Sequence, residues 1–191
     1  MLFRSLIQEK NETLLSDLHQ IIGFCHIIDD TAFLPLQSKD LSPEIPRRIN
    51  KFTDFVDKVV DELRSKNKFN TDGLKATPQR WGYRRYGRYS GLGLSFDLGL
   101  DYWAVRADTP FWLSIKIEDK NQQDKWFVSQ ELINICKKIA FENKIVLEFN
   151  IDNVPYFGIF PLLNQLEDNV VKDLTTKVEQ IIDLVIRDLC N

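Results

Sequence analysis

The sequence is poor in the residues and motifs on which many protein chemistries depend. Its 191 residues include three cysteines, two histidines and one methionine. Cys25, Cys136 and Cys190 lie far apart and form no C-x-x-C pair, which excludes a zinc ribbon and a thioredoxin-type redox motif. Each cysteine falls within an apolar helical pattern, so we expect small buried thiols at these positions.

Glycine and histidine motifs of cofactor and metal sites are also missing. Gly91-x-Gly93 has no third glycine and precedes an expected strand, so it is not a dinucleotide fingerprint, and neither a P-loop nor G-x-S-x-G occurs. His19 and His26 share a helix face at a spacing of seven, whereas helical metal sites use a spacing of four. We therefore expect surface histidines, no resident metal and no cofactor.

Long uncharged runs are absent as well. Charged residues recur every few positions in the opening segment, and no apolar run is long enough to span a bilayer, so we expect neither a signal peptide nor a membrane contact. The reducing cytoplasm is the simplest compartment. The net charge of -3 gives no overall attraction to nucleic acid, so binding of this kind would require a local basic patch.

Apolar residues at three- and four-residue spacings predict four helices, over 2–28, 42–65, 129–143 and 168–190. Ser42 is the expected N-cap of the second helix with Pro43 at its first position, and Ser129 is the expected N-cap of the third. The apolar stripes of 42–65 and 168–190 are expected to be buried against a sheet, with homodimer packing as the alternative.

Alternating and short apolar segments predict the strands. We expect them over 92–97, 100–106, 111–118 and 126–128, followed by a hairpin of 145–151 and 154–162. Strands in runs indicate an α+β fold, in which amphipathic helices cover a largely antiparallel sheet. The turn-rich stretch 65–79 suggests a helical N-terminal part (1–66) packed on a sheet-plus-helix core (80–191), together forming one compact unit.

The most distinctive stretch is Arg80–Glu118, which contains three of the four tryptophans and four of the five tyrosines. Arginine binds phosphate and aromatic rings stack on unpaired bases, so its first part has the ingredients of a nucleic-acid surface. The same residue types are enriched at protein–protein hot spots, and they also pack structurally along a sheet edge. We call this set the Arg/aromatic cluster: Arg80, Trp81, Tyr83, Arg84, Arg85, Tyr86, Arg88 and Tyr89.

Asp101, Glu118 and Lys120 have a spacing that resembles the PD-(D/E)XK nuclease pattern. The resemblance implies two carboxylates that hold Mg²⁺ and a lysine that orients or activates the attacking water. The sequence departs from the pattern at Asp101, which no proline precedes, and beyond the triplet, where the polar run Asn-Gln-Gln-Asp follows.

A second resemblance concerns the layout of the chain. PEIPRRI at 43–49, GRY at 87–89, and Trp103 with TPFWLSI at 109–115 resemble the accessory C-terminal region of uncharacterised bacterial PD-(D/E)XK nuclease-like proteins. The resemblance implies a partner or a stand-alone relative of that region, without the catalytic part.

The favoured hypothesis is a non-catalytic binding protein or accessory subunit that recognises a protein or a nucleic acid through the Arg/aromatic cluster. The alternatives are a metal-dependent nuclease that uses Asp101, Glu118 and Lys120, and a structural homo-oligomer subunit with its seam at the cluster.

Overall fold

The computed structural model describes residues 42–79, 82–100, 103, 109–119 and 125–190, without the side chains of 77–79. The chain divides into two compact units, Met1–Ser42 and Pro43–Asn191, and all described residues except Ser42 belong to the second. The helix expected over 2–28 therefore lies outside the described residues. None of the helices described has the length and apolar content that a membrane crossing requires.

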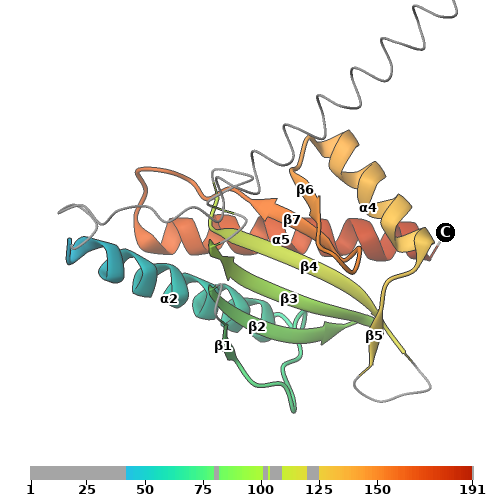
Figure 1. Ribbon diagram of the computed structural model, residues 1–191, viewed down its shortest axis with the longest axis horizontal. Coiled ribbons are helices and arrows are strands. Elements are labelled where there is room, and N and C mark those ends of the chain that lie inside the picture. Colours follow the sequence, from blue (N-terminus) through green and yellow to red (C-terminus); the bar gives the residue numbers. More distant parts are fainter. Residues whose placement is uncertain (1–41, 80–81, 101–102, 104–108, 120–124, 191) are drawn as a thin grey trace, which may run out of the picture. The chain divides into compact units, whose positions relative to one another are not determined.

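Three long helices and seven strands make up the described part of the chain (Figure 1). The helices are α2 (Glu44–Ser65), α4 (Gln130–Asn143) and α5 (Glu167–Leu189). The strands are β1 (Thr77–Gln79), β2 (Gly82–Tyr89), β3 (Leu92–Gly99), β4 (Phe111–Glu118), β5 (Trp126–Phe127), β6 (Leu147–Phe149) and β7 (Pro155–Ile159). The α+β prediction is confirmed.

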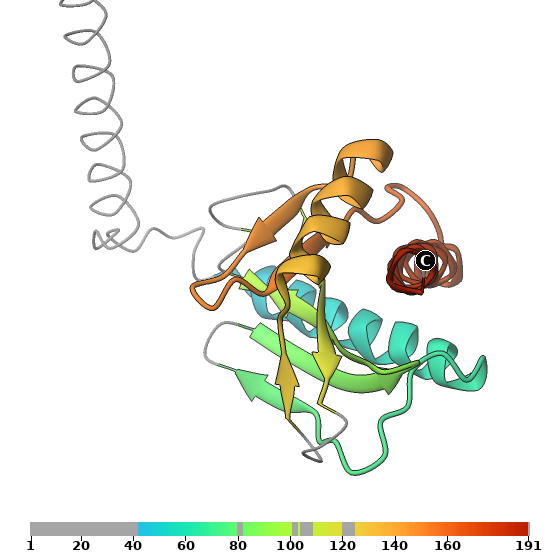
Figure 2. The ribbon, with the colours of Figure 1, turned by 90° about the vertical axis from the view of Figure 1, so that its right-hand side faces the viewer.

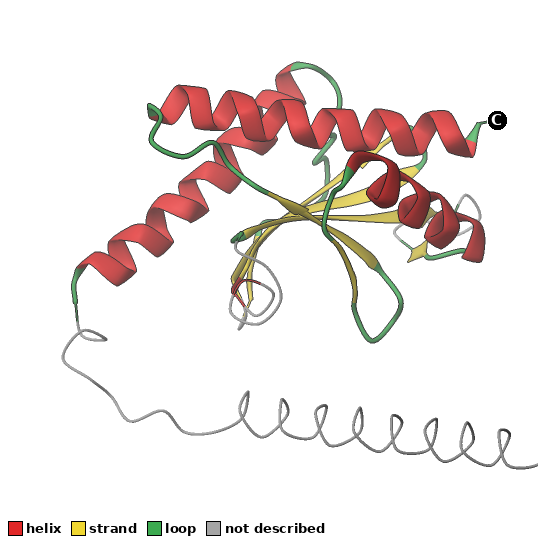
Figure 3. Cartoon of the chain, turned by 90° about the horizontal axis from the view of Figure 1, so that it is seen from above, coloured by secondary structure: helices red, strands yellow, loops and turns green. Residues whose placement is uncertain are grey.

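The strands form one antiparallel sheet in the order β1-β2-β3-β4-β7-β6, and the short β5 pairs with the end of β4. All three helices lie on one face of this sheet (Figure 3), and the view along α5 shows α2 beside it (Figure 2). The core is formed where alternate residues of β3 and β4, such as Phe96 and Leu113, meet the apolar stripes of the helices. Burial of the long helical stripes against the sheet is therefore observed.

Side-chain hydrogen bonds to the backbone fix the start of α4 and the turn between β6 and β7. The Ser129 hydroxyl accepts a hydrogen bond from the Leu132 N–H (3.0 Å), which confirms the expected N-cap of α4. Between β6 and β7 the Asn150 side chain accepts bonds from the N–H groups of Asp152 and Val154, so this residue fixes the hairpin turn.

Three expectations are wrong in detail. Helix α2 begins at Glu44, so Pro43 and not Ser42 occupies the N-cap position, and no side chain caps the first turn. Leu100 and Trp103 are helical where a strand was expected, and Trp103 packs edge-on against Phe52 of α2. Cys136 is buried as expected, but Cys190, the residue that ends α5, is exposed.

Candidate functional site at strand β2

Strand β2 carries the described part of the Arg/aromatic cluster. It pairs with β1 on one side and with β3 along its whole length on the other, where Tyr86 lies opposite Ser95. Successive side chains of a strand point to opposite faces. The cluster is therefore split. Odd-numbered residues face the helices, and even-numbered residues lie on the opposite face, which we call the open face because none of α2, α4 and α5 lies on it.

On the helix side, β2 is joined to α2 through a carboxylate. The Tyr83 hydroxyl donates a hydrogen bond to Asp57 Oδ1 (2.8 Å), and the Arg85 guanidinium forms an ion pair with the same oxygen. Arg85 also lies 3.9 Å from Asp61, and the Tyr89 ring packs against the apolar core. Tyr83, Arg85 and Tyr89 thus attach the strand to the helix layer.

On the open face, Arg84 is bound to Asp97 of β3. Its Nε and one terminal nitrogen lie 2.7 and 2.6 Å from Asp97 Oδ2, and the same terminal nitrogen donates to the Tyr156 hydroxyl (3.2 Å). The guanidinium carbon is 5.8 Å from the ring centroids of both Tyr86 and Tyr156, within the range of cation–π attraction. One arginine therefore connects β2, β3 and β7.

The Asp97 carboxyl group is buried and incompletely hydrogen-bonded. Its residue is 2% exposed, and in the described structure its Oδ1 has no hydrogen-bond partner. Burial raises the pKa of Asp97 to about 6, although the adjacent Arg84 favours the carboxylate form. Asp97 thus has a raised pKa next to a surface arginine.

Small hydroxyl residues occupy the middle of the open face. Tyr86, Ser95, Ser114 and Tyr156 pair in one row across β2, β3, β4 and β7. The two serine hydroxyls bond to each other (2.6 Å) and are almost fully buried. Because the serines are small, the larger tyrosine and arginine side chains on either side have room to fold over them.

Trp126 of β5 forms the other end of this face. Its ring packs over Gly93, where an added Cβ would come within 2.5 Å of it, and lies 5.9 Å from the Tyr86 ring. The indole N–H of Trp126 is buried, and in the described part of the chain it has no hydrogen-bond partner. Beside it, Arg88 Nε lies 3.0 Å from Glu118 Oε1. Aromatic surface and salt-bridged charge thus adjoin each other.

The structure brings some of the sequence-predicted residues together and separates others. Arg84, Tyr86 and Arg88 lie on the open face, whereas Tyr83, Arg85 and Tyr89 face the helices. Arg80 and Trp81 lie outside the described residues. The sequence analysis missed five residues that complete the open face: Ser95, Asp97, Ser114, Trp126 and Tyr156.

One local signal could have found two of these residues. In the strand sequence LGLSFDLG, Ser95 and Asp97 alternate with buried Leu94, Phe96 and Leu98, which marks a second strand face that is polar and yet covered.

The carboxylate set of the nuclease hypothesis is only partly visible. Glu118 is described and forms an ion pair with Arg88, whereas Asp101 and Lys120 lie outside the described residues. Within the described ranges, no group of three or more His, Cys, Asp and Glu side chains could hold a metal ion. His19 and His26 also lie outside them. The nuclease hypothesis therefore remains a prediction from the sequence.

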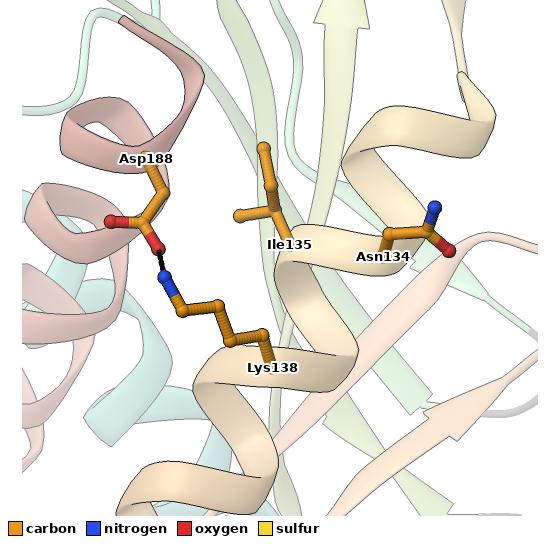
Figure 4. Close-up of a pocket in the computed structure, with 4 residues that line it drawn as sticks. All are labelled: Asn134, Ile135, Lys138 and Asp188. Atoms are coloured by element: carbon orange, nitrogen blue, oxygen red, sulfur yellow. Dashed lines mark hydrogen bonds and ion pairs between the residues drawn. The ribbon is translucent and has the colours of Figure 1, made fainter. Parts of the chain in front are cut away.

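A hollow of about 270 Å³ lies away from the cluster, between α4 and the end of α5 (Figure 4). Lys138 reaches across it to Asp188 (2.9 Å), Ile135 lies beside this ion pair, and Asn134 points away from it. Since the two charged groups in the hollow bind each other, neither is left to anchor a ligand.

Comparisons of the chain with protein-family models, with curated proteins and with solved structures found no match.

Proposed function

We propose that the open face is a protein-recognition surface and that the chain acts as a non-catalytic binding protein or accessory subunit. The observation that carries the proposal is the contact of Tyr86 of β2 with Trp126 of β5, beside Arg84 and Arg88. Tyrosine, tryptophan and arginine are the residues that most often dominate binding energy at protein interfaces. Rigid strands hold these side chains in place, which reduces the entropy lost on binding.

The ion pairs on β2 favour a protein partner over nucleic acid. Arg84, Arg85 and Arg88 are paired with Asp97, Asp57 and Glu118, so each described arginine of the strand has a carboxylate beside it. Phosphate binding would have to compete with these carboxylates, in a chain whose net charge is already -3. A surface with both signs of charge among aromatic rings suits a polar protein interface instead.

The indole N–H of Trp126, for which the described residues supply no hydrogen-bond partner, supports the same proposal. A buried donor without a partner has a free-energy cost of about 1–3 kcal/mol. A carbonyl or carboxylate of a bound protein would remove that cost if binding moved the Trp126 ring toward the partner. The compartment expected from the sequence, the reducing cytoplasm, belongs to this proposal.

Affinity capture with matched variants tests the proposal. Immobilised wild type is compared with Tyr86→Ala on the open face and with Phe141→Ala on α4, where Phe141 is 87% exposed. We expect one protein to be retained by wild type and Phe141→Ala and lost by Tyr86→Ala, and to bind in a purified titration. Equal retention by all three forms, with unchanged melting temperatures, would refute the proposal.

A further inference from the structure

The loop between β7 and α5, whose course Figure 1 shows, carries four exposed large apolar side chains. Phe160 is 41% exposed, Leu162 47%, Leu163 76% and Leu166 79%, within seven consecutive residues. Single exposed apolar side chains are normal in proteins, but a contiguous group marks an interaction site. We call these four residues the apolar loop.

The backbone of the apolar loop is held in place by the first turns of α5. The Leu162 N–H donates to Asp173 Oδ2 (3.2 Å), and Lys177 Nζ donates to the Phe160 carbonyl (2.7 Å) and to Asp173 (2.7 Å). These bonds fix the first part of the loop, at Phe160 and Leu162.

Leu166 occupies a position where a polar residue would stabilise the fold. It is the N-cap of α5 and provides no side-chain hydrogen bond to the first turn. Serine, asparagine and aspartate are strongly preferred at N-caps, because their side chains accept a hydrogen bond from the helix N-terminus. An exposed leucine there gives up stability, which is typical of a residue retained for function.

A shallow hollow of about 360 Å³ adjoins the apolar loop. Its lining is Leu162, Gln165, Asn169, Lys172, Asp173 and Thr176. The last four of these residues follow each other at helical spacing along α5 and form a polar wall, and Leu162 is the apolar residue that faces them. Lys177 and the Leu162 N–H already engage Asp173, and no ion pair of Lys172 is found among the described residues. Lys172 is thus the charge that an incoming group meets.

We propose that the apolar loop and the adjoining hollow dock a short amphipathic helix of a partner protein, with its apolar residues on the leucines and an acidic residue toward Lys172. Four apolar side chains are far fewer than the roughly 20–30 residues a side of a standard interface, which favours a short segment over a second copy of the chain. An amphipathic helix lying in a groove is a recurrent recognition mode. This site is separate from the open face and does not depend on it.

The test uses the ¹⁵N-labelled full chain and a synthetic helical peptide of about 16 residues, long enough for four turns. The peptide has leucines at helical spacing on one face and glutamates beside them. We expect amide shifts confined to residues 160–176, weaker binding when lysines replace the glutamates, and at least about tenfold weaker binding to Leu163→Ser/Leu166→Ser. A serine at position 166 would cap α5. The single variant Leu166→Ser should therefore bind the peptide more weakly, while the melting temperature of the protein is unchanged or higher.

Three results would overturn the inference. The first is the absence of any shift at millimolar peptide. The second is equal peptide affinity for wild type and Leu163→Ser/Leu166→Ser. The third is a concentration-dependent dimer, measured by sedimentation equilibrium, that the double variant abolishes; this would assign the apolar loop to a second copy. Phe141→Ser is the matched control, since it removes an exposed apolar side chain elsewhere and should leave peptide binding unchanged.

Discussion

Two nitrogens of Arg84 converge on one oxygen of Asp97, Oδ2, at 2.7 and 2.6 Å, while Oδ1 of the same carboxylate is buried without a hydrogen-bond partner in the described structure. The Asp97 carboxylate therefore has strong pairing at one oxygen and none at the other. Both the stability of the open face and its response to pH depend on this arrangement.

Removing Arg84 alone should destabilise the protein strongly. In Arg84→Ala the buried Asp97 carboxylate loses its ion-pair partner, and breaking a buried pair in this way costs about 3–5 kcal/mol. The free energy of unfolding is measured by urea denaturation at pH 7. In the double variant Arg84→Ala/Asp97→Ala, which leaves no unpaired charge, part of the loss should be recovered. A loss below about 1 kcal/mol in the single variant would contradict this account of the pair.

Asp97 should also make stability fall as pH rises through the weakly acidic range. Its pKa is raised from 3.8 to about 6 in the folded protein, so between these values the folded state binds more protons than the unfolded state. The contribution of Asp97 is therefore largest below pH 4 and is lost as pH approaches 6. Urea denaturation of wild type and Asp97→Asn across this range measures the difference. If the free energy of unfolding had the same slope against pH in the two proteins, the raised pKa of Asp97 would be excluded.

Gly93→Ala should displace the Trp126 ring from the open face. The added Cβ would lie 2.5 Å from the indole ring, closer than van der Waals contact allows, and overpacking of this kind costs about 1–3 kcal/mol. Near-ultraviolet circular dichroism and urea denaturation report the change. Gly158→Ala in the same sheet is the control, because its Cβ would approach neighbouring atoms only to 3.4 Å. Similar effects of the two substitutions would argue against a close Trp126–Gly93 contact.

The two helix N-caps should respond to substitution in opposite directions. Ser129→Ala removes the hydrogen bond to the Leu132 N–H and should lower the free energy of unfolding by about 1 kcal/mol. Leu166→Ser adds a cap where α5 has none and should raise it by a similar amount. Chemical denaturation of both variants measures these two opposite changes in the free energy of unfolding. A destabilised Leu166→Ser would show that the leucine has a structural role.

The helices and the central strand were predictable because their large apolar residues recur periodically in the sequence. In β4, Phe111, Leu113 and Ile115 alternate and pack into the core, and the apolar stripe of α5 repeats every three or four residues. Such patterns indicate that one face of the element is buried against a large apolar layer, whichever helix or strand supplies that layer. Fold class could therefore be derived from sequence alone.

Strand β2 was not predicted, because its side chains are covered through polar contacts and not through a periodic apolar pattern. Tyr83 and Arg84 are covered through bonds to Asp57 and Asp97, which lie 26 and 13 residues away in the chain. Local alternation cannot reveal a partner at that distance. Tyr156 reaches the open face only because β7 pairs with β4, and this pairing is a property of the sheet topology.

The central claim is that the open face recognises protein while the arginines of β2 serve its structure. Fluorescence anisotropy with labelled single-stranded and duplex oligonucleotides, at low and at physiological salt, tests it most directly. The account predicts no binding to either oligonucleotide at physiological salt, because carboxylates already neutralise Arg84, Arg85 and Arg88. Salt-sensitive binding that is lost in Arg84→Ala/Arg85→Ala, with the fold of that variant intact by circular dichroism, would contradict it and assign the surface to nucleic acid.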